Sequence, residues 1–220
     1  MPDLSTIGTF VAVVLGLFLI PGPAVLLVLT RTVQGGRRVG VATGLGIATG
    51  DALHTLGASI GLSALLMTSA LAFNVVKWVG AAYLVYLGIR ALRAKRVQTD
   101  APASEFAEVP GASQAVKPLS AGRAYLQAIP TELLNPKTAL FFLAFLPQFV
   151  HASQGAPFMQ FAVLGAIFAV LSALYTSLIA LTIRPLSRIL KRLAWLRRWQ
   201  NQVIGLIFIS LGLKVATQTR

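Results

Sequence analysis

The chain has no cysteine, only six acidic residues and only two histidines among its 220 residues. The lack of cysteine excludes disulfides, thiolate metal sites and cysteine nucleophiles. Charged residues make up 11% of the chain, whereas a soluble domain contains about one-quarter. Hydrophobic residues make up 56%. So few charges cannot cover a water-facing surface, and we therefore expect most of this surface to face lipid.

The 19 basic residues give the chain a net charge of +13. In a soluble protein this excess would suggest a nucleic-acid partner. In a membrane protein, basic residues instead collect in cytoplasmic loops beside the anionic inner leaflet. Fifteen of the 19 fall in three segments between apolar runs, at 31–38, 90–123 and 184–198. We interpret the charge as membrane topology, with both chain termini outside, and expect membrane lipids rather than nucleic acid as partners.

Apolar runs predict six membrane-spanning helices, each close to the roughly 20 residues that cross a bilayer. The predicted spans are Leu4–Leu29, Val39–Met67, Leu71–Leu92, Leu126–Val150, Phe158–Ile183 and Trp199–Thr217. The stretch 94–120 contains several prolines, lacks helical periodicity and predicts a cytoplasmic linker. It divides the chain into a first half at 1–93 and a second half at 121–220. Three spans in each half predict an all-α membrane protein of two inverted three-helix repeats.

The first helix of each half, which is the first and fourth span, carries a predicted break. A Pro-Gly-Pro sequence interrupts the first apolar run and removes two backbone donors. In the fourth run, an Asn-Pro pair has the pattern of an N-cap and first turn. The start of such a half-helix presents unpaired N–H groups that suit a carboxylate. The predicted substrate-binding residues are Pro21, Gly22, Pro23, Asn135, Pro136 and Lys137. The alternative at each break is a proline kink that needs no ligand.

The second predicted span carries Asp51 and His54, three positions apart and therefore near one another on the helix. An ionised Asp is costly in a bilayer, so we expect it to face a cavity or the bundle interior. A buried carboxylate beside an imidazole can relay protons, and we predict that this pair couples transport to protons. A structural ion pair, or a histidine bonded to backbone, is the alternative.

Six glycines also lie in this span, arranged as three small-xxx-small pairs: Gly40, Gly44, Gly46, Gly50, Gly57 and Gly61. Small residues at this spacing let neighbouring backbones approach closely. The pattern therefore predicts that this helix is central in the bundle or forms a homodimer contact.

Five stretches of this chain resemble a known family: PGP at 21–23, GD at 50–51, YLVYLG at 83–88, LLNPK at 133–137 and LFFLAFLPQF at 140–149. They are similar to the lysine-exporter (LysE/RhtB) family of bacterial amino-acid exporters. The resemblance implies a multi-pass secondary transporter in the bacterial inner membrane. It further implies export of amino acids or close analogues, driven by the proton gradient. No residue pattern calls for a cofactor.

One position departs from the family pattern, because Glu132 stands three residues before the Asn, where a neutral amide is usual. We include Glu132 among the predicted substrate-binding residues. An added carboxylate at the site favours a cationic amino acid, or it only pairs with Lys137. On the first interpretation, replacing Glu132 by Gln shifts preference away from lysine and arginine.

Three other functions compete with amino-acid export. A channel would conduct without alternating access, and the sequence has no charge ring or filter-like repeat. An exporter of another small solute or ion is the second alternative, although soft metal ions suit a chain without cysteine poorly. A membrane enzyme is the third. The chain has no His-Glu-x-x-His motif and its two histidines lie far apart, so we expect no enzyme.

Overall fold

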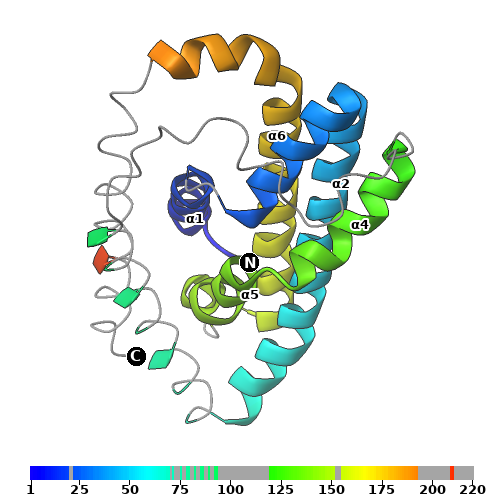
Figure 1. Ribbon diagram of the computed structural model, residues 1–220. Coiled ribbons are helices and arrows are strands. Elements are labelled where there is room, and N and C mark those ends of the chain that lie inside the picture. The colour runs from blue at the N-terminus through cyan, green and yellow to red at the C-terminus, as the bar shows by residue number, and fades with distance from the viewer. Residues whose placement is uncertain are drawn as a thin grey trace.

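The computed structural model describes residues 1–19, 22–69, 119–151 and 155–192, together with ten isolated residues between 71 and 93 and residues 209–210. In this part of the chain all regular structure is helical, which confirms the all-α class (Figure 1). The elements are α1 (Leu4–Phe18), α2 (Pro23–Thr68), α4 (Ala121–Leu133), α5 (Pro136–Leu140), the π-helix η1 (Phe141–Phe145), the 3-10 helix η2 (Leu146–Phe149) and α6 (Pro157–Arg192).

The predicted third and sixth spans and the linker at 94–120 lie almost wholly outside the described residues. The six-span topology, the inverted repeat and the division into 1–93, 94–120 and 121–220 therefore stay predictions.

The first span is broken where the Pro-Gly-Pro sequence predicts it. Asp3 starts α1 as an N-cap, because its Oδ1 accepts a hydrogen bond from the Thr6 N–H at 2.7 Å. Helix α1 ends at Phe18 and α2 begins at Pro23, with a bend of 58° between them. Pro21 itself lies outside the described residues.

Helix α2 folds back on itself at Gly36. This residue has φ 81° and ψ 179°, a conformation that glycine adopts readily and residues with a Cβ rarely do. The two arms, 23–35 and 37–68, lie side by side, because Val28 of the first and Ile47 of the second share one buried cluster. The fold-back at Gly36 separates the first two predicted spans, Leu4–Leu29 and Val39–Met67.

The second arm of α2 lies between α4 and α6 (Figure 1) and contacts both. A Cβ on Gly50 would come 2.7 Å from Cβ of Glu132 in α4. A Cβ on Gly44 would come 2.9 Å from Cβ of Thr176 in α6. Only glycine allows approaches this close, so among the described helices this arm packs between two others, whereas Gly57 and Gly61 of the third pair meet no described atom within 4 Å. The homodimer contact stays a prediction.

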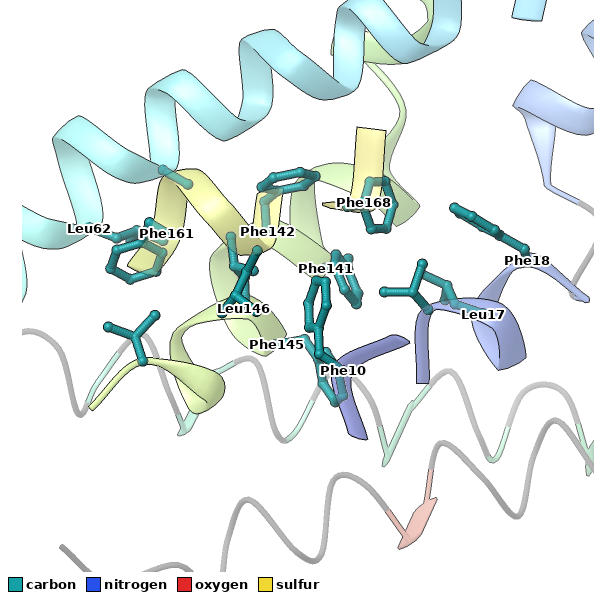
Figure 2. Packing of buried hydrophobic residues seen from close by; sticks show 14 residues of the cluster. Phe10, Leu17, Phe18, Leu62, Phe141, Phe142, Phe145, Leu146, Phe161 and Phe168 are labelled. Carbon is teal, nitrogen blue, oxygen red and sulfur yellow. The ribbon is translucent and has the colours of Figure 1, made fainter. Parts of the chain in front are cut away.

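Phenylalanines join α1 to the second half of the chain. Figure 2 shows Phe10 and Phe18 of α1 beside rings of η1 and α6. The rings of Phe141 and Phe168 stack at 4.8 Å, and Phe18 meets Phe168 edge-on at 5.3 Å. Lipid tails are as apolar as these side chains, so close packing and ring geometry, rather than escape from water, favour the cluster. This cluster forms one wall of the site described below.

The outer faces of the helices carry exposed apolar side chains, as a lipid-facing surface requires. Ile60 of α2, Leu126 of α4 and Leu174 of α6 are 60%, 65% and 63% exposed. By length and composition, α6 is long and apolar enough over Pro157–Thr182 to cross a membrane, with a mean hydropathy of 2.1 in its most apolar window. The bent pair of α1 and α2, from Leu4 to Leu65, meets the same criterion only when its two helices are taken together.

Candidate functional site

A small cavity lies where the two breaks face the middle of α2 and α6. Its volume is about 40 Å³, room for about three waters. Of the predicted site residues, the cavity brings together Gly22, Asp51, Glu132, Asn135 and Lys137. The full lining is Leu17, Phe18, Gly22, Ala24, Val25, Ile47, Asp51, Glu132, Asn135, Lys137, Thr138, Phe168, Ser172, Tyr175 and Thr176. Pro23 and Pro136 are exposed and do not line it.

At the second break, Glu132 is a buried carboxylate that accepts hydrogen bonds from its own chain. It is 2% exposed. The Asn135 side-chain amide donates to both of its oxygens, at 3.3 and 3.2 Å, and the Thr138 hydroxyl donates to Oε1. Charge-assisted bonds of this kind compensate the loss of hydration on burial. The carboxylate of Glu132 is therefore already held by the residues that follow it in the chain.

The start of α5 is capped as the Asn-Pro pair predicts. Asn135 Oδ1 accepts from the Lys137 N–H at 3.1 Å, and Pro136 occupies the first helical position. The following turn changes to a π-helix over Phe141–Phe145. The predicted break in the fourth span is therefore present, and its new helix start is satisfied by its own side chain.

At the first break, the start of α2 has no such cap. Its N-cap residue is Gly22, which has no side chain to accept a hydrogen bond, and the next residue is Pro23. The N–H groups of Ala24 and Val25 belong to the first turn and have no acceptor within the helix. Both residues line the cavity. A positive helix end therefore opens onto the cavity.

Asp51 is the second buried carboxylate of the cavity, and its surroundings differ from those of Glu132. It is 1% exposed and lies close enough to Glu132 and Ser172 for electrostatic interaction. In the described part of the chain, however, neither carboxylate oxygen has a hydrogen-bond partner of ordinary geometry. A buried carboxylate without a donor is unfavourable unless it binds a proton or a cation.

Lys137 links the two breaks. Its Nζ donates at 3.0 Å to the carbonyl oxygen of Leu17 in the last turn of α1, where a cation is favourable. Its ammonium also interacts electrostatically with Glu132. A Cβ on Gly22 would lie 3.3 Å from Cδ of Lys137, so the glycine leaves room for this side chain. With both acids ionised, the described cavity holds two carboxylates and one ammonium.

His54 lies outside the cavity. Its Nε2 is 3.2 Å from the backbone oxygen of Glu132, and its ring stacks on Phe142 at 5.5 Å. It lines an apolar groove of about 340 Å³ together with Gly57 and Leu143. The His54 ring is therefore hydrogen-bonded to backbone. It makes no hydrogen bond to the Asp51 carboxylate.

Six polar or aromatic residues of the cavity were not among the predicted site residues: Phe18, Thr138, Phe168, Ser172, Tyr175 and Thr176. Ser172 and Thr176 stand four apart in an apolar run, a spacing that places two hydroxyls on one helix face. Another signal was available, because Asp51 and Glu132 are the only two acidic residues within the predicted spans. Two costly groups in separate spans are expected to share one polar site.

Comparison with known proteins assigns the family. The family model described as LysE type translocator matches residues 15–219. An uncharacterised membrane protein of Pseudomonas aeruginosa, PA4757, is 33% identical over 227 residues, covering 100% of this chain and 99% of its own. A leucine efflux protein of Klebsiella pneumoniae subsp. pneumoniae is 31% identical over 201 residues, which cover 91% of this chain and 90% of the relative. An uncharacterised membrane protein of Bacillus subtilis, YrhP, is 30% identical over a region that covers 89% of this chain and 91% of the relative. No solved structure matches.

The family match spans both breaks, all residues that line the cavity, and α6. It confirms the resemblance to the lysine exporters noted in the sequence. The chain belongs to the LysE type translocator family.

Proposed function

We propose that this protein exports amino acids across the bacterial inner membrane, with the described cavity as its substrate site and protons as the coupling ion. The observation that carries the proposal is the cavity itself, which places an open helix N-terminus and a buried, unpartnered carboxylate side by side. An amino acid carries the two complementary charges. Family membership and relatives named leucine efflux proteins support the same function.

The substrate class we propose is a neutral amino acid with an apolar side chain. Leu17, Phe18, Val25, Ile47 and Phe168 supply the apolar part of the lining. Glu132, which in sequence favours a cationic substrate, already accepts bonds from Asn135 and Thr138. A pocket of this kind discriminates by shape and by the pairing of a few polar groups.

The cavity is small in this structure. Its 40 Å³ is far below the roughly 300–1,000 Å³ of ordinary ligand pockets. Loading a substrate therefore requires the walls to separate, and the two breaks are the places where the helices bend. We assign the coupling proton to Asp51. One proton moving inward contributes about 2.3 kcal/mol per 100 mV of membrane potential toward export.

The test is efflux from bacterial cells loaded with amino acids by feeding dipeptides. Cells that express the protein should release leucine faster than cells without it, and an uncoupler should abolish the difference. Asp51→Asn should abolish it as well, whereas His54→Gln should retain at least about half. Efflux that survives Asp51→Asn but not His54→Gln would transfer the coupling role to the histidine. No efflux of any amino acid would refute the proposed function.

A further inference from the structure

We infer that Asp51 is the receptor for the α-ammonium group of the substrate, and that a proton and the substrate compete for this one carboxylate. The inference rests on the proposed function. It adds the orientation of the amino acid in the cavity and the way in which proton and substrate replace one another there. Its starting point is the difference in hydrogen bonding between the two buried carboxylates.

Asp51 is the better placed of the two carboxylates to accept a new donor, although the Ser172 side chain and the Glu132 carboxyl lie near enough to interact with it. Glu132 accepts from Asn135 and Thr138, so a ligand cation would have to displace bonds already made. Both oxygens of Asp51 are buried and lack a hydrogen-bond partner among the described residues, and Asp51 lines the cavity. An ammonium group placed there would supply the missing donors and the missing positive charge.

The complementary end of the pose is the start of α2. Gly22 provides no side-chain cap, and the first-turn residues Ala24 and Val25 line the same cavity as Asp51. Their N–H groups and the helix dipole suit a carboxylate. The start of α5 does not offer the same receptor, because Asn135 already caps it. A zwitterion is therefore oriented with its carboxylate toward α2 and its ammonium toward Asp51.

The side chain of the substrate is left to the apolar wall. Ile47 lies one helical turn before Asp51, and Phe168 lies on α6, four residues before Ser172. With both charged ends of the zwitterion placed, these side chains are the surfaces that remain. They favour a branched aliphatic side chain over a charged one.

Competition follows from the presence of a single open carboxylate. The ionised form of Asp51 binds the ammonium; protonation converts it to a neutral acid and removes the attraction. The exchange is balanced: the carboxylate gains one proton, and the substrate leaves with its ammonium intact. The titratable groups that face Asp51 within the described cavity are Glu132 of α4, Lys137 of α5 and Tyr175 of α6. The ends of α1 and α2 at the cavity contribute none, and His54 lies on another face of α2.

The experiment measures equilibrium binding to the purified full-length protein in lipid nanodiscs. The probes are leucine, 4-methylpentanoate, which lacks the amino group, and 3-methylbutylamine, which lacks the carboxylate. Wild-type protein should bind leucine at least about tenfold more tightly than 4-methylpentanoate, since a charge-assisted bond is lost. The affinity for leucine should fall as the pH is lowered.

In Asp51→Asn the advantage of leucine over 4-methylpentanoate should shrink to about twofold or less, and the pH dependence of binding should disappear with it. Asp51→Glu should restore part of both, which a merely misfolded protein would not show. His54→Gln, a variant on another face of α2 and outside the cavity, should keep the advantage of leucine. If His54→Gln instead removes it, or if Asp51→Asn keeps it, the assignment to Asp51 is wrong.

The outcomes separate this inference from the proposed function. Wild-type protein that binds leucine with an affinity independent of Asp51 leaves an exporter whose ammonium receptor lies elsewhere, and only the inference fails. Wild-type protein that neither binds nor exports any amino acid removes both.

Discussion

The two helix breaks contain similar residues, but only the second one ends in a helix start that is capped by a side chain. At the second break, Asn135 caps the new helix and also donates to Glu132, so each of these two polar side chains has a partner within the chain. At the first break, Gly22 offers no side-chain cap, and the first turn of α2, whose N–H groups have no acceptor within the helix, opens onto the cavity. One break is closed by its own side chains; the other is open.

The difference indicates that the two breaks have different roles. A closed break is stable without a ligand and can hold a fixed shape, as a scaffold requires. An open break keeps unpaired groups at membrane depth, which is tolerated only beside a cavity or a partner. Asp51 lies in the same cavity, and its carboxylate has no hydrogen-bond partner among the described residues. The cavity thus brings together a negative carboxylate and the positive N-terminus of α2. The closed break is thus expected to control stability, and the open break to control transport.

The largest expected effect comes from removing the acceptor at the closed break. Glu132→Ala leaves the buried donors of Asn135 and Thr138 without their partner, at about 1–3 kcal/mol for each. We expect a loss of about 2–4 kcal/mol in the free energy of unfolding, measured by denaturant titration of the purified protein in detergent micelles. Glu132→Gln keeps one acceptor oxygen and should lose less. Equal stability of Glu132→Ala and wild type would show that these bonds are not what stabilises the break.

Packing of α2 against the closed break should be the next most sensitive feature. Gly50→Ala places a methyl group 2.7 Å from Cβ of Glu132, and overpacking of this kind costs about 1–3 kcal/mol. Gly57→Ala is the matched control on the same helix, because no described atom outside the helix lies within 4 Å of the added methyl group. It should be neutral or slightly stabilising. Thermal unfolding of the two variants side by side measures the difference, and equal losses would argue against the close contact.

The helix cap should contribute less than these features. Asn135→Ala removes the acceptor for the Lys137 N–H, about 0.5–2 kcal/mol for a helix N-cap, and also the amide that donates to Glu132, so its total loss exceeds that of the cap. Asn135→Ser restores a capping oxygen but not the amide that donates to Glu132, so its stability should lie between those of Asn135→Ala and wild type. The measurement is again thermal unfolding. A serine variant no better than the alanine variant would mean that the bond to Glu132, rather than the cap, is what matters.

The smallest change in stability, with a large change in transport, is expected when the open break is closed. Gly22→Ser supplies a capping hydroxyl worth only a few tenths of a kcal/mol over glycine, and its Cβ, 3.3 Å from Cδ of Lys137, requires that flexible side chain to shift slightly. The added oxygen competes for the N–H groups of the first turn of α2, and export should fall by at least about half in the dipeptide-loading assay. Gly16→Ser in α1 is the control, because its added Cβ meets no described atom within 4 Å. Wild-type export by Gly22→Ser would show that the open helix end does not bind the substrate.

Local rules were sufficient to predict the breaks, but not what the breaks face. An Asn-Pro pair specifies a helix start within four residues, and the structure has that start at Asn135. The π-helix at Phe141–Phe145 has no comparable local signal in the sequence. The presence of Asp51 and Glu132 in one cavity depends on how α2 and α4 rotate about their axes, which no single sequence window encodes.

His54 illustrates the limit of spacing arguments. Residues three apart on a helix are related by about 300° of rotation, which leaves them about 60° from a common direction. That offset is enough to aim Asp51 into the cavity and His54 into the apolar groove beside Phe142. Sequence spacing predicts neighbours on a helix, whereas the neighbouring helices determine which of them share a cavity.

The bond from Lys137 to the carbonyl oxygen of Leu17 has a consequence for biosynthesis. It joins residues 120 positions apart. At roughly 5 to 20 residues per second, a ribosome takes about 6 to 24 s to pass from one to the other. Through that interval the end of α1 is in the nascent chain without Lys137, and the cavity cannot exist until the fourth predicted span has been made. The site therefore forms late in synthesis, after the helix that provides one of its walls.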